Sequence, residues 1–456
     1  MLFRVVDYAE WTAFLPFHRP FAICWLGIIV VIFFPLASNS PQGENMIDTI
    51  FTSRWFIQRA RQGVFGDHID RLAALLLKQG YPKETAEHKI SLVAALGRWL
   101  EERRFGITEL NEEKVESFIR ARKRRRTIQR GDRKMFRLLL DQLRSSGSIP
   151  PPPAVVPSAL ERALQEYTDY LVRERGLASR TVSQYRHYIR AFLIERFGTR
   201  SVRLSALRQA DTHKHLQRKS AVVCSKTLHG MTAALRSYLT FLHLRGDIQT
   251  DLASGVPAVA CWRLSTVPRF LKPDEVRQLL DSCDQSTIKG QRDYTILLML
   301  ARLGLRAGEV VAMRLDDIHW DTGEMLVRGK GQRHDRLPIP KDVGEALASY
   351  LRGGRPRCQT RHVFVRINAP HREFACPSDI STIVRQTIAR AGLHPPCTGA
   401  HVLRHSLATH MLQRGASLAE IGEVLRHRSP ITTELYSKVD LSALHTLAQP
   451  WPEEGL

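Results

Sequence analysis

The stretch YTILLMLARLGLR, residues 294–306, is a mostly apolar run that ends in a glycine, a leucine and an arginine. A run of this length with so few polar positions predicts a helix that is buried in a core. Gly304 and Leu305 close the run, and Arg306 is expected at the start of the next helix. The C-terminal part of the chain is therefore expected to fold around a buried helix.

Two short strands are predicted downstream of this helix. Residues 324–328 and 336–339 flank Gly329-Lys330-Gly331, which indicates a hairpin with a lysine held in a glycine turn. A helical stretch is expected around residues 343–351, and three further helices before the end of the chain. Upstream, Pro273-Asp274-Glu275 places a proline and two acids in the first turn of another helix. This region is predicted to be mainly α, with a small antiparallel sheet.

Six polar side chains of this region have the chemistry to surround a phosphate. His401 and Arg404 are three residues apart and share one helix face. His427 comes just before Ser429-Pro430, which indicates a helix start with proline at the first position, and Tyr436 is expected on that helix. The six residues are Arg306, Lys330, His401, Arg404, His427 and Tyr436.

A metal site is the alternative use of the histidines. His401 and His405 lie one helical turn apart, and His410 follows. No H-E-x-x-H sequence and no third-ligand pattern accompanies them. We therefore expect neither a metal nor another cofactor.

At these residues the sequence resembles the tyrosine recombinase (phage integrase) family. The resemblance to the family's catalytic domain covers about residues 270–451, and residues 158–250 resemble the family's helical, SAM-like core-binding domain. Each motif is weak alone, but their order and spacing fit together. The matching stretches are Gly304-Leu305-Arg306-Ala307-Gly308-Glu309, Gly329-Lys330-Gly331, His401-Val402-Leu403-Arg404-His405, Leu425-Arg426-His427 and Thr433-Glu434-Leu435-Tyr436.

The resemblance implies phosphodiester chemistry. The transition state of such a reaction spreads negative charge over the equatorial oxygens, so that fixed cations lower the barrier. Arg306 and Arg404 are suited to this role because their planar guanidinium groups bind phosphate oxygens bidentately and stay charged. Tyr436 is implied as the nucleophile, and its phenol, with a reference pKa of about 10, needs help from cations or a base.

The other implied roles concern proton transfer and orientation. His401 is implied as the base or orienter of the tyrosine, Lys330 as the proton donor to the departing 5′ oxygen, and His427 as a hydrogen-bond donor to the phosphate. Glu309 is expected to orient the arginine or histidine groups, with a structural ion pair as the alternative. The family's usual glycine before the histidine is Arg426 here, so the preceding helix is predicted to lose its easy left-handed cap.

The implied function is site-specific recombination: DNA strands are cut and rejoined through a 3′-phosphotyrosine, without metal or ATP, as in integration or transposition of mobile DNA. The alternatives are DNA relaxation like that of a type IB topoisomerase, and a non-catalytic DNA-binding protein. The expected partners are double-stranded DNA and copies of the chain in a homo-tetramer on two DNA sites. The tail after Tyr436, residues 439–447, is expected to dock on a neighbouring protomer or to pack back on its own domain.

The charge of the chain also favours nucleic acid. The 67 Lys and Arg residues exceed the 45 Asp and Glu residues, which gives a net charge of +22 and a field that attracts polyanions. Residues 120–134 hold the densest basic run, and a solvated surface is the alternative to phosphate contact there. The candidate DNA-binding residues of the run are Arg122, Lys123, Arg124, Arg125 and Arg126.

The rest of the chain indicates further domains. Residues 80–86 resemble residues 176–182 at an offset of 96, which predicts two similar helical modules. The segment SSGSIPPPPAVVP, residues 145–157, is typical of a linker. The expected regions are an apolar N-terminal extension (1–45), an additional helical DNA-binding module (46–145), a Pro-rich linker (146–157), a core-binding domain (158–255) and a catalytic domain (270–456).

The apolar run FAICWLGIIVVIFFPLA, residues 21–37, does not match the rest. A secretory signal is a weak explanation because acids offset the basic residues before the run. The two others are a membrane anchor and an artefact of a true translation start at Met46, so membrane contact is expected only if the run is native. The seven cysteines form no C-x-x-C pair, which favours a reducing interior. A cytoplasmic location at the nucleoid is expected for the DNA recombinase that the resemblance implies.

Overall fold

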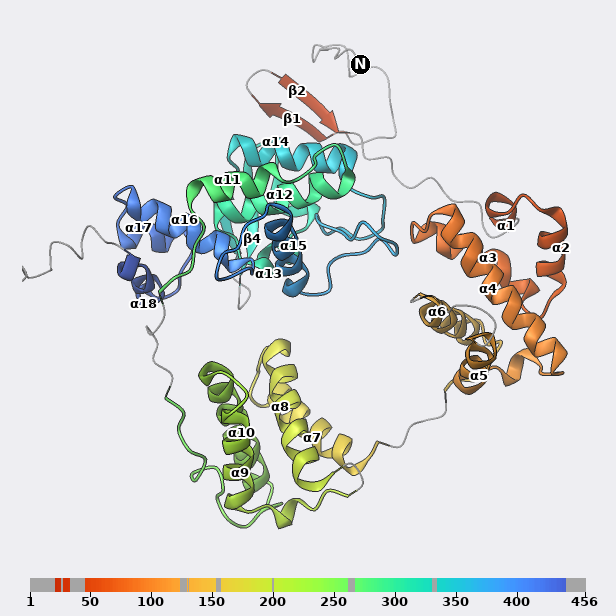
Figure 1. Cartoon of the computed structure of the whole chain (residues 1–456), viewed down its shortest axis with the longest axis horizontal. Coiled ribbons are helices and arrows are strands. Elements are labelled where there is room, and N and C mark those ends of the chain that lie inside the picture. The colour runs from red at the N-terminus through yellow and green to blue at the C-terminus, as the bar shows by residue number, and fades with distance from the viewer. Residues whose placement is uncertain are drawn as a thin grey trace, which may run out of the picture. The chain divides into compact units, whose positions relative to one another are not determined.

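The computed structural model describes residues 21–25, 28–32, 46–123, 129, 131–152, 157–198, 201–260, 267–329 and 334–439. The chain divides into two compact units, one formed by Pro152–Ser265 and the other by Met1–Pro151 with Thr266–Leu456. Helices dominate both units, and a three-stranded antiparallel sheet is present in the second (Figure 1). The predicted fold class, mainly α with a small antiparallel sheet, is confirmed.

The apolar N-terminal run is described over two short segments. Strands β1 (Phe21–Trp25) and β2 (Ile28–Ile32) pair antiparallel, with Phe21 opposite Ile32. Across the described residues, no helix is long and apolar enough to cross a membrane.

Residues 46–151 form a helical module with its own core. Leu72, Leu76 and Leu96 are fully buried in it, and the ring of Phe118 meets that of Phe136 edge to face at 5.6 Å. The helices are α1 (Met46–Ile50), α2 (Arg54–Gln62), α3 (Gly66–Lys78), α4 (Lys83–Glu102), α5 (Glu112–Lys123) and α6 (Asp132–Ser145).

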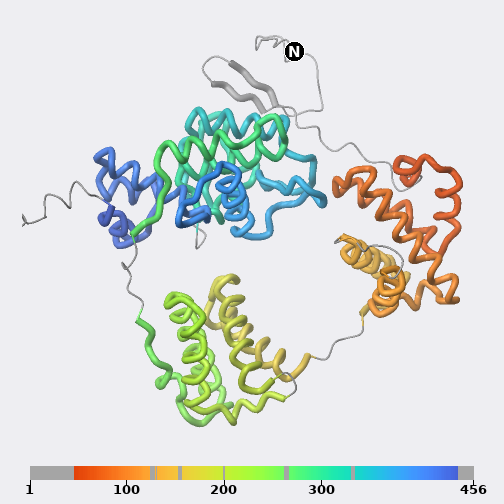
Figure 2. The backbone as a smooth tube through the Cα atoms, in the orientation of Figure 1, coloured from red at the N-terminus to blue at the C-terminus, as the bar shows by residue number. Residues whose placement is uncertain are grey.

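Residues 152–265 form a separate helical unit with a core of its own. Tyr167 and Tyr238 are fully buried and pack edge to face, with ring centroids 4.9 Å apart. Figure 2 shows the backbone of this unit as packed helices. They are α7 (Ala159–Arg173), α8 (Ser179–Phe197), α9 (Gln209–Ser220) and α10 (Ser225–Leu244).

The two helical regions share a local feature at the predicted offset of 96 residues. Gly80 (φ 78°) and Gly176 (φ 56°) both adopt the left-handed conformation. The next helices, α4 and α8, begin at Lys83 and Ser179. A left-handed residue after a helix ends it and turns the chain, and glycine adopts that conformation without steric cost. The sequence similarity therefore corresponds to the same turn between two helices.

The third region is built around α12, which carries the apolar run quoted above. Ile296, Leu297, Met299 and Leu300 of this helix are fully buried, as the run predicts. The helices of the region are α11 (Pro273–Asp281), α12 (Ile288–Leu303), α13 (Ala307–Ala312), α14 (Lys341–Ser349), α15 (Pro377–Arg390), α16 (His401–Gln413), α17 (Leu418–Val424) and α18 (Pro430–Thr433).

The sheet of this region has the order β3 (Ile318–His319), β4 (Glu324–Arg328) and β5 (His334–Pro338). In the β4–β5 hairpin, Val327 pairs with Asp335 and Arg328 with His334. The predicted strand 324–328 is confirmed, whereas the second begins at residue 334 rather than 336. Strand β3 was not predicted, because two residues carry no detectable alternation of polar and apolar side chains.

The C-terminal helices differ from the prediction in two ways. Four helices, α15 to α18, follow residue 351 in the described part of the chain, rather than three. Tyr436 does not lie on the helix that Pro430 begins, because α18 has only four residues and continues as the 3-10 turn η6 (Glu434–Val439). Helix ends commonly tighten into 3-10 geometry. The turn packs Tyr436 into a small core with Ala408, Leu412, Ile421 and Leu425.

Candidate active site

The end of α12 sets the position of Arg306. Gly304 caps the helix with φ 56°, and a Cβ atom there would lie 2.7 Å from Cδ2 of Leu425, so only glycine fits without displacing a neighbour. Two residues later, Arg306 is the N-cap of α13. Its backbone N–H donates to Oε2 of Glu309 at 2.9 Å, and its Nη1 donates to Oε1 of Glu309 at 2.7 Å.

The Glu309 carboxylate is buried and ionised. Only 5% of the residue is exposed. Burial alone would raise its pKa, but the backbone N–H of Arg306 and the guanidinium groups of Arg426 and Arg306 together hold the pKa below its usual value. Glu309 therefore carries a negative charge at neutral pH and fixes the direction of the Arg306 side chain.

Arg404 connects three elements from α16. It is 3% exposed, and its Nη1 donates to the carbonyl of Gly304 while its Nη2 donates to the carbonyl of Leu425. Burial, with the nearby charges of Arg306 and Arg426, lowers its pKa to about 10. The guanidinium still stays protonated at neutral pH.

Arg426 retains the cap that the sequence predicted to be lost. Its φ is 54°, so this arginine itself adopts the left-handed conformation that glycine normally supplies, and His427 N donates to Gly422 O at 2.9 Å. The prediction was wrong because the arginine itself adopts this conformation, although a Cβ atom disfavours it. Its Nη2 donates to Oε2 of Glu309 at 2.9 Å, and the side chain is 8% exposed.

The hydroxyl of Tyr436 is hydrogen-bonded to a histidine. Tyr436 is 2% exposed, and its Oη lies 2.9 Å from Nδ1 of His405. Burial raises the pKa of Tyr436 to about 12, although the charge of Arg404 acts in the opposite direction. The phenol is thus neutral, and it loses its proton only if a neighbour accepts it.

His427 lies on the other side of the tyrosine. Its ring is parallel to that of Tyr436, with an interplanar angle of 5° and 6.5 Å between centroids. Its Nδ1 lies 2.8 Å from Oγ1 of Thr433, which is 2% exposed. This contact fixes the ring, and burial with the charges of Arg404 and Arg306 lowers the pKa of His427 to about 4.

His405 contacts the tyrosine. His401, the expected base or orienter, is exposed, and its ring lies 6.0 Å from that of His405. His405 shares a helix face with Ala408 and Leu412, and Tyr436 packs on this face. Burial, with His401 and Arg404 nearby, lowers the pKa of His405 to about 4. The available signal was its place directly after the arginine of the quoted motif.

The remaining candidate residues are less fully described. Lys330 lies outside the described residues, as do Arg124, Arg125 and Arg126. Arg122 and Lys123 end helix α5, far along the chain from the site above. No group of three His, Cys, Asp or Glu side chains in the described ranges has the arrangement to hold a metal ion.

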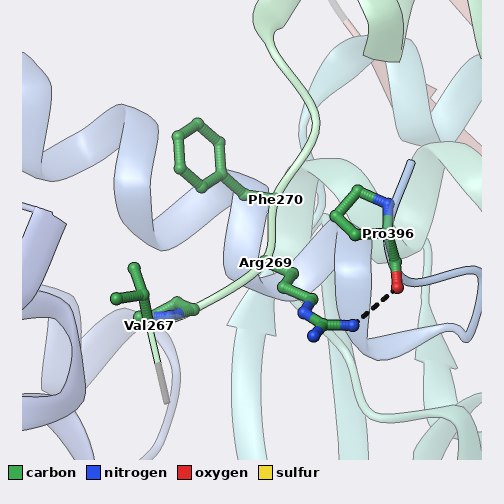
Figure 3. A pocket seen from close by; sticks show the side chains of 5 residues that line it. Val267, Arg269, Phe270 and Pro396 are labelled. Atoms are coloured by element: carbon green, nitrogen blue, oxygen red, sulfur yellow. Dashed lines mark hydrogen bonds between the residues drawn. The ribbon is translucent and has the colours of Figure 1, made fainter. Parts of the chain in front are cut away.

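A surface pocket of about 430 Å³ lies elsewhere in this region. It is lined by residues 267–270 and Pro396, and Arg269 Nη1 donates to the carbonyl of Pro396 at 2.8 Å (Figure 3). None of the candidate residues lines it.

Known proteins resemble the chain along most of its length. The model of the "Phage integrase family" matches residues 269–442, and that of the "Phage integrase, N-terminal SAM-like domain" matches residues 164–246. A putative integrase/recombinase, y4rA of Sinorhizobium fredii, is 43% identical over 401 residues, which cover 88% of this chain and 97% of the relative. Tyrosine recombinase XerD of Listeria monocytogenes is 29% identical and covers 60% of this chain, with 93% of its own length matched.

Solved structures match at lower identity. A lambda integrase dimer bound to a COC′ core site is 16% identical, with a TM-score of 0.47, covering 75% of this chain and 88% of that one. XerH recombinase bound to palindromic difH substrate is 18% identical, also with a TM-score of 0.47, covering 64% of this chain and 85% of that one.

Proposed function

The chain belongs to the phage integrase family of tyrosine recombinases, and from this premise we propose that Tyr436 cuts DNA within a site-specific recombination reaction. One observation carries the proposal: the buried hydroxyl of Tyr436 is hydrogen-bonded to His405 and lies within reach of the charge of Arg404, while Arg404 and Arg306 donate to the adjacent carbonyls of Leu425 and Arg426. The expected intermediate is a 3′-phosphotyrosine with a free 5′ hydroxyl.

The proposed reaction begins at the phosphorus atom. Tyr436 Oη attacks phosphorus, the bond to the 5′ oxygen breaks, and the negative charge that grows on the other oxygens is stabilised by Arg306 and Arg404. Both guanidinium groups are already held by protein carbonyls, so little reorganisation accompanies the reaction. Lys330 is proposed, from the family resemblance alone, to protonate the departing oxygen.

Proton removal from Tyr436 is the costly step. With a pKa of about 12, ionising the phenol at pH 7 before attack would cost about 7 kcal/mol. His405 is neutral at that pH because its own pKa is about 4, so its ring nitrogen is available to accept the proton as the bond to phosphorus forms. We therefore assign His405 as the proton acceptor, with His427 as the donor to the phosphate.

The partners follow from the same chemistry. Double-stranded DNA is the substrate, and the core-binding domain (158–255), the N-terminal module (46–145) and the basic residues Arg122–Arg126 are proposed to contact it. Exchange between two sites cuts two strands at each, which needs four nucleophiles and therefore a homo-tetramer. We also propose that the enzyme acts in the cytoplasm on the nucleoid, with integration or transposition of mobile DNA as its role.

A nicked suicide substrate taken from the DNA that flanks the gene tests the proposal. The wild-type chain is expected to form a covalent protein–DNA adduct, and Tyr436→Phe is expected to form none. The matched control is Tyr350→Phe, because Tyr350 is also buried and its hydroxyl also has a hydrogen-bond partner, the backbone N–H of Val365. An adduct that persists in Tyr436→Phe would contradict the assignment.

A plasmid assay with the same protein distinguishes recombination from DNA relaxation. Incubation with a supercoiled plasmid that lacks the flanking site is expected to leave it supercoiled, and two plasmids that carry the site are expected to give recombinant joints. Relaxation of arbitrary sequences without joints would indicate a topoisomerase instead.

A further inference from the structure

We propose that Arg426 is a positioning residue that aims Arg306 at the phosphate by fixing the far side of the Glu309 carboxylate. This inference rests on the proposed function, since it concerns how one phosphate-binding arginine is held. It assigns a role to a residue that stands where a glycine is usual in the family.

Contacts around Glu309 show how such positioning works. Oε2 of Glu309 accepts two hydrogen bonds of 2.9 Å, one from the backbone N–H of Arg306 and one from Nη2 of Arg426. Oε1 accepts the 2.7 Å bond from Nη1 of Arg306. With donors on both sides of Oε2, the carboxylate cannot rotate about its own axis without breaking a charge-assisted bond. Without Arg426, only Arg306 itself would hold the group that orients it.

The position of Arg426 is costly, which argues against a purely structural role. An L-residue in the left-handed conformation is disfavoured relative to the right-handed one, because its Cβ atom comes too close to the following carbonyl oxygen. The buried guanidinium also lies near two other cations, Arg306 and Arg404, whose repulsion lowers the pKa of Arg404. Its Nε has no hydrogen-bond partner among the described residues. Glycine would remove each of these costs, so stability alone does not account for the arginine.

A second contact links Arg426 to the hairpin. Its Nε lies 4.0 Å from Oδ2 of Asp335, which is on strand β5. Nη1 of Arg426 reaches the carbonyl of Leu303 at 3.5 Å, at the end of α12. The side chain therefore reaches the end of α12 and lies near the sheet while it binds Glu309.

The test is Arg426→Gly, matched by Arg104→Gly. Arg104 also has a positive φ, 57°, but is exposed in the N-terminal module, so both changes relieve the same backbone strain. Arg426→Gly is expected to fold normally and bind DNA with unchanged affinity, while the rate of adduct formation at saturating DNA falls about 10- to 100-fold. Arg426→Lys is expected to recover part of the rate, and Arg104→Gly to cleave at the wild-type rate.

A double variant separates positioning from direct phosphate contact. If Arg426 acts through Glu309, then Arg426→Gly combined with Glu309→Gln is expected to be no slower than Glu309→Gln alone. The proposal would be overturned if the rate losses of the two single variants multiplied in the double variant. It would also be overturned by a wild-type rate in Arg426→Gly, or by a fall in DNA affinity as large as the fall in rate.

A readout independent of catalysis keeps this inference distinct from the proposed function. The guanidinium NMR signals of Arg306, assigned by their loss in Arg306→Lys, are expected to stay sharp in the wild type and Arg104→Gly and to broaden in Arg426→Gly. Unchanged Arg306 signals in Arg426→Gly would overturn the positioning role even if the wild type forms adducts. Broadened signals would support it even if no adduct forms, in which case only the proposed function fails.

Discussion

The site has a guanidinium side, Arg306 and Arg404, and a tyrosine side, Tyr436 and His405, and the two sides are held in different ways. Arg404 donates to two backbone carbonyls, and Arg306 binds both Glu309 and the carbonyl of Arg426. On the tyrosine side, the hydroxyl of Tyr436 is hydrogen-bonded to His405. The arginines proposed to bind the phosphate are thus positioned by the protein itself, whereas the proposed nucleophile depends on a contact with His405 that a proton transfer can change.

Burial also acts on the two sides with opposite outcomes. It lowers the pKa of Arg404 only to about 10, so that group remains charged at neutral pH. The same effect lowers the pKa of His405 to about 4 and raises that of Tyr436 to about 12, so both are neutral. One side therefore supplies fixed charge, and the other supplies a proton donor and a proton acceptor.

Among the variants that test this comparison, Arg404→Lys is expected to reduce adduct formation most. Lysine keeps a charge but cannot donate to both Gly304 and Leu425 from one planar group, so adduct formation is expected to fall about 100- to 1000-fold. Arg302→Lys is the control, because Arg302 is an exposed arginine of α12 that pairs with Asp342. A rate in Arg404→Lys that equals the control would show that prebuilt geometry is unimportant.

His405→Asn tests the tyrosine side. An amide can keep a hydrogen bond to Tyr436 but cannot take its proton, so the rate of adduct formation is expected to fall about 100-fold, with normal DNA binding by a filter assay. The control is His394→Asn, an exposed histidine of the same region. A wild-type rate in His405→Asn would contradict the assignment of this residue as the proton acceptor.

Acid should weaken the folded state through the same histidine. The folded-state pKa of His405 is about 4, below the unfolded value of about 6.5, so the unfolded chain binds more protons between these values. Its contribution to stability is complete above about pH 6.5 and is lost as the pH falls toward 4. In thermal unfolding between pH 4 and 8, the stability of the wild type is expected to fall more steeply with decreasing pH than that of His405→Asn. Equal slopes of stability against pH would contradict the lowered pKa of His405.

Thr433→Val should have the smallest effect. It removes the hydrogen bond to Nδ1 of His427 but keeps the side-chain volume, so the cleavage rate is expected to fall about 3- to 10-fold. Thr432→Val changes the exposed neighbouring residue and is expected to match the wild type in the same assay. Equal rates for the two variants would show that the tautomer of His427 does not depend on Thr433.

The sequence predicts the elements whose signals are local. The apolar run of α12, the β4 strand and the start of α13 at Arg306 follow from periodicity and turn residues, and the structure has them where expected. The mainly α fold class follows from the same patterns.

Long-range packing decides what the sequence misses. Whether His401 or His405 meets Tyr436 depends on which face of α16 the turn η6 packs against, and nothing in the α16 sequence states that. Likewise, propensity places glycine at a left-handed cap, so the conformation of Arg426 and its bond to Glu309, 117 residues away, were not foreseeable.

The central claim is that the hydroxyl of Tyr436 attacks the phosphate that the arginines bind, and adduct mapping tests it most directly. A DNA–protein adduct formed on the suicide substrate would be digested with nuclease and trypsin, and the modified peptide sequenced by tandem mass spectrometry. The account predicts a nucleotide on SPITTELYSK, residues 429–438, which contains Tyr436 as its one tyrosine. A nucleotide attached to any other peptide would contradict it.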